Sequence, residues 1–258
     1  LNVTDANLDE VWYQLNNGTV TTDNYTWTSS ISQTVWDQVE NGNVSIIFYA
    51  NDTFNHLGFA NVTVRKNIDN PIITIENPQE NELFGIIAPN ITIYKSGTEL
   101  NTTWYTIDYG VTNYTFFGLN VVINQAAWDN YGFGDVIITF YINDSLGKIG
   151  YDIISLRKDP DSPEITIFFI NPSTNNTYWD IEPTFRVLVY EPNNHSIWYR
   201  VGMTNVFISN NTDIELQSAI WNDLPQGIFT IEIFANDTLG YLNDSITLTF
   251  YKDTLAPS

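Results

Sequence analysis

The chain has 258 residues, and nine Lys and Arg against thirty Asp and Glu give a net charge of −21. This balance excludes a nucleic-acid binder, which needs clustered positive charge. The absence of Cys excludes disulfides and thiolate metal sites, and the two His leave little room for histidine chemistry. No stretch approaches the roughly 18 apolar residues of a membrane span, so no membrane insertion is expected in this segment.

Three copies of one pattern follow one another along the chain, with a period of 92 to 94 residues. Three sets of markers keep this spacing independently, which predicts a tandem repeat of one structural unit. The markers are the Asp of an Asn-Asp pair (Asp52, Asp144 and Asp237), a lone tryptophan (Trp36, Trp128 and Trp221), and the tryptophan of a Trp-Tyr pair (Trp12, Trp104 and Trp198).

The first unit, residues 1–69, is predicted to lack its front strands. Trp12 has only eleven residues before it, whereas Trp104 lies 33 residues after the Pro71 that opens the second unit. A short helical turn is expected at Ile31–Trp36, followed by an alternating strand at Val44–Ala50. Two explanations stay open: the chain is a window from a longer array, or a neighbouring chain donates the missing strand.

The second unit, residues 70–162, follows a proline-containing break at 69–71. A strand is expected at Ile72–Ile75, a helical turn at Ile123–Trp128, an alternating strand at Val136–Ile142 and a returning strand at Ile153–Leu156. The Asn-Asp pair between the last two strands favours a turn, because both side chains can bond the local backbone.

The third unit, residues 163–258, repeats this order and ends in the beginning of another linker. A helical turn is expected at Leu216–Trp221. The expected strands are Ile165–Ile170, Thr184–Tyr190, Ser196–Val201, Val206–Ile208, Ile228–Ala235 and Ser245–Tyr251.

Six or seven short strands in about 92 residues predict an all-β fold: tandem immunoglobulin-like antiparallel β-sandwiches in an elongated array. We interpret both tryptophan series as core residues. Trp12, Trp104 and Trp198 would lie in a mid-chain strand, and Trp36, Trp128 and Trp221 would close the sandwich end. The alternative for the exposed members of either series is a platform on which sugars stack.

The pattern resembles the immunoglobulin-like or fibronectin type III-like repeat modules of prokaryotic, especially archaeal, cell-surface and adhesin proteins. The resemblance rests on an alternating strand that ends in Ala-Asn-Asp-Thr-x-Gly and on a linker of the form Asp-x-x-x-Pro. The closest stretches are 224–227 with 237–240, and 252–257. The resemblance implies a stalk, adhesin or surface-layer component and no catalytic residues.

The chain contains fifteen Asn-x-Ser/Thr acceptors for N-glycosylation, where random placement predicts about five. Heavy glycosylation would imply export to the cell surface and would keep a weakly charged surface soluble. The other reading is that Asn and Thr co-occur in turns beside strands. The candidate residues are Asn2, Asn17, Asn24, Asn43, Asn51, Asn61, Asn90, Asn101, Asn113, Asn143, Asn175, Asn194, Asn210, Asn236 and Asn243.

Four linker acids, Asp69, Asp159, Asp161 and Asp253, lie where consecutive units meet. Carboxylates of a linker and a neighbouring loop suit Ca²⁺, which takes six to eight oxygen ligands. Calcium is therefore the one candidate ion, although no segment matches the spacing of a dedicated calcium loop and turn chemistry explains the same residues. No other cofactor is expected.

No catalytic residues are expected. The recurring carboxylates follow the repeat, and the sequence contains neither a Gly-rich phosphate loop nor Gly-x-Ser-x-Gly. His56 and His195 are interpreted as solvated loop residues. The sequence therefore predicts a non-enzymatic extracellular segment of a larger surface protein. Its partners are neighbouring repeats of the same chain and further copies in a coat or fibre. The alternatives are a carbohydrate- or protein-binding module and a filament subunit assembled by strand exchange.

Overall fold

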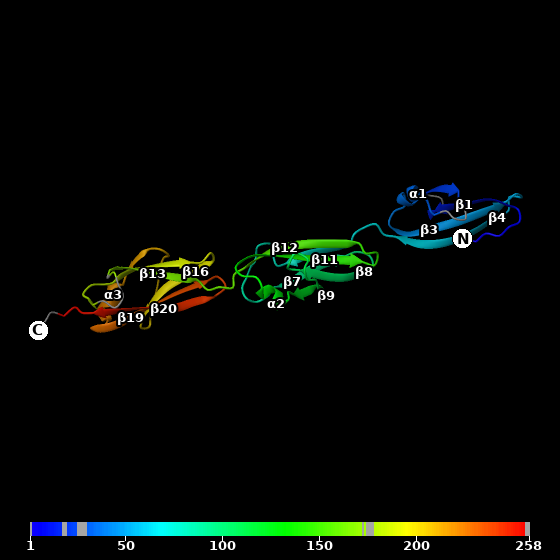
Figure 1. The fold of residues 1–258 in the computed structure, drawn as a ribbon. Coiled ribbons are helices and arrows are strands. Elements are labelled where there is room, and N and C mark those ends of the chain that lie inside the picture. Colours follow the sequence, from blue (N-terminus) through cyan, green and yellow to red (C-terminus); the bar gives the residue numbers. More distant parts are fainter. Residues whose placement is uncertain (1, 17–19, 25–29, 172, 174–177, 256–258) are drawn as a thin grey trace.

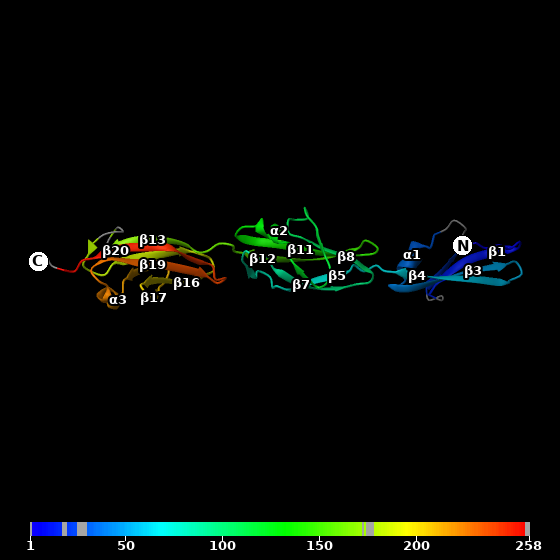
Figure 2. The same ribbon diagram turned by 90° about the horizontal axis from the view of Figure 1, so that it is seen from below.

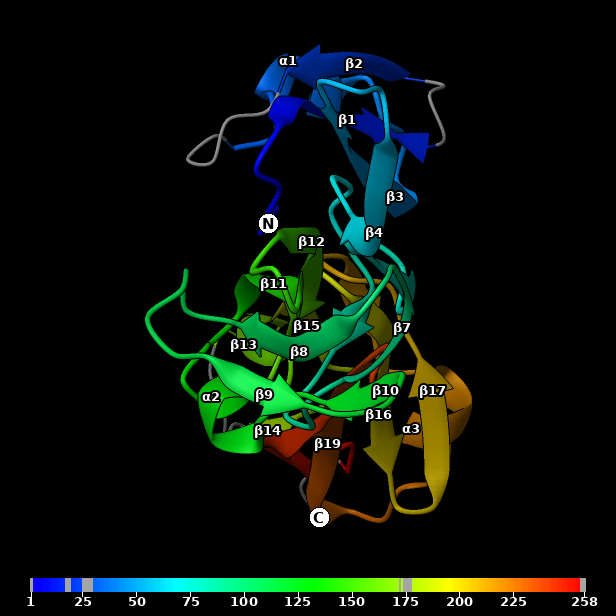
Figure 3. The ribbon, with the colours of Figure 1, turned by 90° about the vertical axis from the view of Figure 1, so that its right-hand side faces the viewer.

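The computed structural model describes residues 2–16, 20–24, 30–171, 173 and 178–255. The strands form three groups, which follow one another in a single row from the N-terminal to the C-terminal end (Figures 1 and 2). In the view along the row, the second and third groups project onto each other and the first is displaced to one side (Figure 3). We call these groups the first, second and third unit.

The first unit is one antiparallel sheet with the strand order β2-β1-β3-β4. A single helical turn precedes the long hairpin formed by its last two strands. Its elements are β1 (Leu8–Leu15), β2 (Val20–Asn24), α1 (Gln33–Asp37), β3 (Gly42–Asp52) and β4 (Leu57–Lys66).

The second unit has two sheets, with the orders β10-β7-β5 and β6-β12-β11-β8-β9. All pairs are antiparallel except β6 with β12, which is parallel. The elements are β5 (Ile72–Asn77), β6 (Leu83–Phe84), β7 (Asn90–Ser96), β8 (Leu100–Thr106), β9 (Tyr114–Phe116), β10 (Asn120–Val122), α2 (Gln125–Asp129), β11 (Gly134–Asp144) and β12 (Ile149–Lys158).

The third unit repeats this topology with sheets in the orders β13-β15-β18 and β14-β20-β19-β16-β17. Its elements are β13 (Glu164–Asn171), β14 (Tyr178–Trp179), β15 (Thr184–Tyr190), β16 (Asn194–Val201), β17 (Thr204–Phe207), β18 (Asp213–Glu215), α3 (Ser218–Asp223), β19 (Gly227–Asp237) and β20 (Leu242–Lys252). The same order in two sequence-distant segments shows that the repeated sequence pattern encodes one fold.

The predicted fold class is confirmed: the second and third units are antiparallel sandwiches of immunoglobulin type, arranged as an elongated array. All six strands expected in the third unit are present, and the three helical turns begin two residues later than expected. The two-residue β14 and the three-residue β18 were not predicted, because segments so short have no visible periodicity. The unit boundaries at 69/70 and 162/163 stay a prediction.

Alternation along the long strands places every second side chain in a core. In β11, Val136, Ile138, Phe140 and Ile142 are buried, and the residues between them are half-buried or exposed. Each unit has its own buried cluster, and the clusters of the second and third units are larger than that of the first. The sandwiches are therefore held together separately, and the linkers carry the contacts between them.

No helix in the described part of the chain is long and apolar enough to cross a membrane.

Candidate functional site

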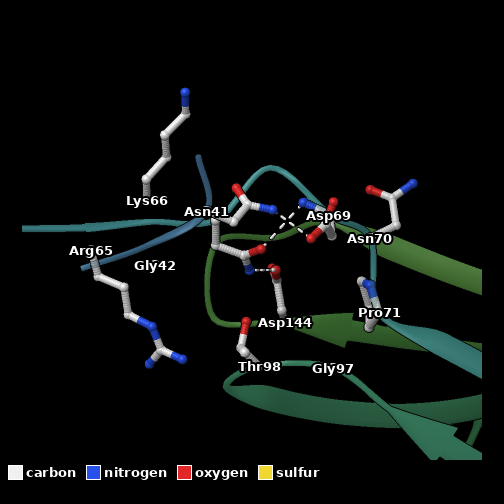
Figure 4. Close-up of a pocket in the computed structure, with 11 residues that line it drawn as sticks. Asn41, Gly42, Arg65, Lys66, Asp69, Asn70, Pro71, Gly97, Thr98 and Asp144 are labelled. Atoms are coloured by element: carbon white, nitrogen blue, oxygen red, sulfur yellow. Dashed lines mark hydrogen bonds between the residues drawn. The ribbon is translucent and has the colours of Figure 1, made fainter. Parts of the chain in front are cut away.

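A cavity of about 260 Å³ lies where the first and second units meet (Figure 4). It is lined by the end of the β3–β4 hairpin, the linker and the turn that follows β11; we call this region, around residues 67–71, the first joint. Here the Asn67 amide donates to Asp144 Oδ2 at 3.1 Å, and the Asn41 amide donates to Asp69. Figure 4 shows these amide–carboxylate pairs, which suit a joint rather than a catalytic cleft.

Lysine chemistry completes the first joint. The Lys148 ammonium, in the turn between β11 and β12, donates to the backbone carbonyls of Asn67 at 2.5 Å and Asp69 at 3.5 Å. Arg65 and Glu99 form an ion pair of 2.6 Å across the same region, with both side chains about half exposed. An exposed pair contributes only about 0–1 kcal/mol, so the lysine is the main cationic contact at this joint.

The repeated Asp of the Asn-Asp pair fastens the turn that follows its strand. Asp144 Oδ1 accepts from the backbone N–H groups of Leu146 and Lys148, both at 2.9 Å. Asp52 makes the equivalent bonds in the first unit, and these bonds lower the pKa of its carboxyl. The turn chemistry expected for this position is therefore present in the structure.

The region around residues 159–163, which we call the second joint, brings three carboxylates together. Asp159 and Asp237 are each 1% exposed. The Asn193 amide donates to Asp159 Oδ2 at 2.5 Å, and the Asn193 backbone N–H donates to Glu191 Oε1 at 3.1 Å. Burial raises the pKa of Glu191, and the charges of Asp159 and Asp237 raise it further. These four residues come from both sides of the joint.

Of the linker acids considered as calcium ligands, only Asp159 is buried. Asp69, Asp161 and Asp253 are exposed, and they lie in three different linker regions, so the four do not form one site. No group of three or more His, Cys, Asp or Glu side chains among the described residues is arranged to hold a metal ion by itself. Sequence reasoning did not identify Glu191 or Asn193, since neither lies in a linker or keeps the repeat spacing.

The core assignment of Trp12, Trp104 and Trp198 is wrong. These three side chains are half-buried and face outward, and the next residue in each pair, Tyr in every copy, is buried instead. Adjacent residues of a strand point to opposite faces, so only one residue of each Trp-Tyr pair can enter the core. The buried residues are Tyr13, Tyr105 and Tyr199.

The outward tryptophans form a row of aromatic rings on the outer face of each unit. Trp12 stacks on Tyr49 and Trp104 on Tyr141, with ring centroids 5.3 Å apart in both pairs, and Trp198 stacks on Phe234 at 5.2 Å. A third ring continues each row, and it is strongly exposed in all three units. These rings are Phe59 (74% exposed), Tyr151 (65%) and Phe207 (72%).

The other tryptophan series closes the sandwich end as expected, and a lysine that was not predicted completes it. Trp128 and Trp221 are buried and Trp36 is half-buried. In each unit a buried lysine places its ammonium 5.0 to 5.4 Å from the tryptophan ring centre and donates to two carbonyls at the end of the helical turn. The signal was visible in the sequence, since these lysines keep the repeat spacing: Lys66, Lys158 and Lys252.

The candidate glycosylation residues divide by exposure. Asn2, Asn43, Asn61, Asn90, Asn101, Asn113 and Asn210 are exposed, and Asn51, Asn143, Asn194, Asn236 and Asn243 are half-buried. Asn17, Asn175 and the side chain of Asn24 lie outside what the structure describes.

Two of the half-buried acceptors have a structural task. Asn51 Oδ1 accepts from the Glu10 N–H at 3.0 Å, and Asn143 Oδ1 accepts from the Thr102 N–H at 2.8 Å. Each bond spans a register shift between neighbouring strands. The repeated acceptor position is thus explained in part by strand geometry.

The two histidines are exposed, as expected. His56 lies in the turn after β3 with Nδ1 2.9 Å from Asp52 Oδ2. His195 lies in β16 and not in a loop, and it contacts the adjacent Ser196.

No protein-family model matches the chain, and no curated protein sequence matches it. Among solved structures, the chain is similar to part of a 1.5-MDa bacterial ice-binding adhesin, with 10% identity, a TM-score of 0.42, and coverage of 95% of this chain and 86% of the other. It is also similar to fibronectin(III)-like modules of Clostridium thermocellum CbhA (14%, 0.34, 72% and 98%). A third similar structure is a tetra-tandem repeat from the extending region of a large adhesion protein (12%, 0.32, 97% and 69%). These TM-scores are below 0.5, and the sandwich architecture described above rests on the strand order of the chain itself.

Proposed function

We propose that the chain is a non-catalytic spacer segment of an extracellular surface protein of a prokaryote, archaeal by its sequence resemblance. Such a segment forms part of a stalk, an adhesin or a surface layer. The observation that supports it is the row of separately packed units, whose joints are built from specific side-chain contacts (Figures 1 and 4). Each unit then lengthens the chain by a fixed step, and the joints limit bending between steps.

Small-angle scattering of the purified chain tests this proposal. A spacer gives the pair-distance distribution of a monomeric rod with three maxima of mass along one axis. A compact particle, or a broad ensemble of hinge angles at both joints, would contradict it. A variant in which 69–71 is replaced by a Gly-Ser linker of equal length is the control, because flexible linkers release the orientation of the unit that they carry.

We also propose that the exposed acceptors carry N-linked glycans on the native protein. The structure offers an internal control. The Asn210 amide donates to the Val189 carbonyl at 3.0 Å, and its oxygen accepts from the Val189 N–H at 2.9 Å, so the side chain is engaged although it is exposed. Glycopeptide mapping should find sugar on Asn61 and Asn90, which have no such bonds, in preference to Asn210. Native protein with the bare mass of 29.5 kDa would refute glycosylation.

A carbohydrate-binding role is the second candidate, and the outer aromatic rows favour it. Sugar rings stack on exposed aromatic faces, and the third ring of each row is 65% exposed or more. Glycan-array binding that is lost in Phe59→Ala and Tyr151→Ala would support this role. The matched control is Phe133→Ala, which removes an exposed aromatic outside the rows.

Strand exchange is the third candidate, favoured by the open inner face of the first unit. Val62 of β4 faces inward yet is 46% exposed, while Ile154 at the equivalent register in β12 is 4% exposed. A strand from another chain could cover this face. Filaments that separate only under denaturing conditions would support it, and a monomer at all concentrations would refute it.

A further inference from the structure

The two joints can be compared position by position. Asn67 and Asp159 each follow the buried lysine that ends the preceding unit. Lys148 and Tyr241 are the turn residues whose carbonyls accept from the strand-end Asp, at 3.0 Å and 3.2 Å. The second joint therefore has Asp where the first has Asn, and Tyr where the first has Lys.

These two replacements remove the donors that serve the strand-end Asp. In the first joint the Asn67 amide reaches Asp144 Oδ2, and the Lys148 ammonium lies nearby, on the linker carbonyls. In the second joint the amide is a carboxylate, and the Tyr241 hydroxyl contacts the preceding unit instead, accepting from the Ile86 N–H at 2.9 Å. Glu191 adds another carboxylate at the position of Gly97.

The result is a set of oxygens that lack donors. Within the described residues, Asp237 Oδ2 is buried and has no hydrogen-bond partner, and the same holds for the side-chain oxygens of Asn193 and Asn194. Asn194 pairs with Asp237 in register across β16 and β19, so these atoms are neighbours. No hydrogen bond or ion pair in the described part of the chain joins Asp159, Glu191 or Asp237 to a Lys or Arg side chain.

Burying carboxylates costs free energy unless each charge is compensated. Asp237 is 1% exposed and directs an unpartnered oxygen toward the group formed by Asp159, Glu191 and Asn193. Only acceptors are present, so the missing partner must be positively charged or must donate several hydrogen bonds. A bound metal ion satisfies several oxygens at once, which a single proton cannot do.

We propose that the second joint binds one divalent cation of the Ca²⁺ class, held by Asp159, Glu191 and Asp237 together with the amide oxygens of Asn193 and Asn194. At the first joint, the Lys148 ammonium and the Asn67 amide replace such an ion. The cation would clamp the second unit to the third, because Asp159 belongs to the linker and the other four residues belong to the third unit.

The donor set selects the ion. All five ligands offer oxygen, and carboxylate with amide oxygen is the chemistry of Ca²⁺, whereas Zn²⁺ prefers the His and Cys that are absent here. Fewer than three acidic side chains converge without the amides, so the site is mixed and irregular, which Ca²⁺ tolerates and octahedral Mg²⁺ does not. A mixed site of this kind belongs in the affinity range of extracellular modules, Kd of about 10⁻⁴–10⁻³ M. In this respect the inference rests on the proposed extracellular function.

Calorimetric titration of the full chain with CaCl₂ tests the proposal directly. One equivalent of Ca²⁺ should bind with a Kd below about 1 mM, and the thermal midpoint of the third unit should rise with Ca²⁺ concentration. Mg²⁺ at equal ionic strength controls for screening of the net charge of −21. Absence of binding at 10 mM Ca²⁺, or an equal response to Mg²⁺, would overturn the proposal.

The site is located by Asp159→Asn, which converts the second joint to the donor pattern of the first. Asn is isosteric with Asp and removes one charge, so Ca²⁺ affinity should fall at least tenfold while the third unit stays folded, as near-ultraviolet dichroism reports. Asp161→Asn is the matched control: it removes the same charge two residues away at an exposed position, and it should leave affinity within twofold. Equal loss in both variants, or none in Asp159→Asn, would overturn the assignment.

Two outcomes separate this inference from the proposed function. A monomeric rod in scattering that binds no Ca²⁺ retains the spacer and refutes the cation site. A chain that binds Ca²⁺ at Asp159 but stays compact with or without it retains the site and refutes the spacer.

Discussion

The two joints of this chain solve one problem with opposite chemistry. The first connects units through a lysine ammonium and an asparagine amide that belong to the chain itself. The second gathers carboxylates and amide oxygens with no cationic side chain of the described residues among them. A repeat can therefore conserve its sandwich while its junctions differ in what they require from the solution.

The largest expected effect tests whether the units fold independently of their joints. In Lys158→Met, the carbonyls of Trp128 and Tyr131, which accept from the ammonium at 2.7 Å and 2.5 Å, lose their donor. Leaving buried carbonyls unsatisfied should destabilise the second unit by about 3 kcal/mol in urea unfolding. The third unit and the response of the second joint to Ca²⁺ should be unchanged. Simultaneous loss of the third unit would show that the comparison of independent joints is misplaced.

A steric change should separate a rigid joint from a yielding one. A Cβ at Gly150 would lie 1.8 Å from the Pro71 carbonyl oxygen of the first linker, whereas a Cβ at Gly85 would lie 2.0 Å from the Tyr241 hydroxyl at the second joint. Backbone cannot move aside as a side chain can, so Gly150→Ala should cost about 1–3 kcal/mol in thermal or urea unfolding. Gly85→Ala should cost less and should displace Tyr241 instead. Equal costs would mean that both joints are equally tight.

Lys148→Met should loosen the first joint without unfolding either neighbour. The ammonium contacts the carbonyls of Asn67 and Asp69 in the linker, and Met keeps the aliphatic stem. Scattering should show a wider range of angles between the first two units, and each thermal midpoint should stay within about 2 °C. Lys95→Met, at a half-buried lysine outside the joint, is the control. An unchanged angle distribution would remove the role of Lys148 as the built-in cation.

The smallest effect is expected for Tyr241→Phe. It removes the hydroxyl that accepts from the Ile86 N–H at 2.9 Å across the second joint. Ile86 is exposed, so water can replace the bond, and the loss should be under about 1 kcal/mol. Hydrogen exchange of the Ile86 amide should accelerate, and Ca²⁺ affinity should stay within twofold. A larger fall in affinity would place the hydroxyl among the ligands.

The fold was largely predictable because alternation and period are local properties of the sequence. Val44–Ala50 and its two copies show which residues face inward, and the structure confirms this face. The Trp-Tyr pairs show the limit: both residues are aromatic, and only pairing of Trp12 with Tyr49 across two strands fixes which one points outward. Burial of lysine runs against its usual exposure, so the role of Lys158 needed the carbonyls at the end of α2 to become visible.

The joints were less predictable because they depend on residues brought together from distant segments. Asp159 was expected at an inter-unit site, but Glu191 and Asn193 reach it only through the packing of the third unit against the linker. The acceptor count indicated an excess of Asn-x-Ser/Thr, and the strand geometry then assigns Asn51 and Asn143 a structural bond. Neither distinction is present in sequence spacing.

The buried lysines also determine how the surface presents itself to reagents and enzymes. The chain has five lysines: Lys66, Lys158 and Lys252 are enclosed in their units, and Lys95 and Lys148 are half-buried. Trypsin-like proteases and amine-coupling reagents, both of which need an accessible ε-amino group, would meet a nearly amine-free exterior. A molecule exposed to digestive enzymes outside a cell would gain durability from this arrangement, with no armour beyond the placement of its few cationic side chains.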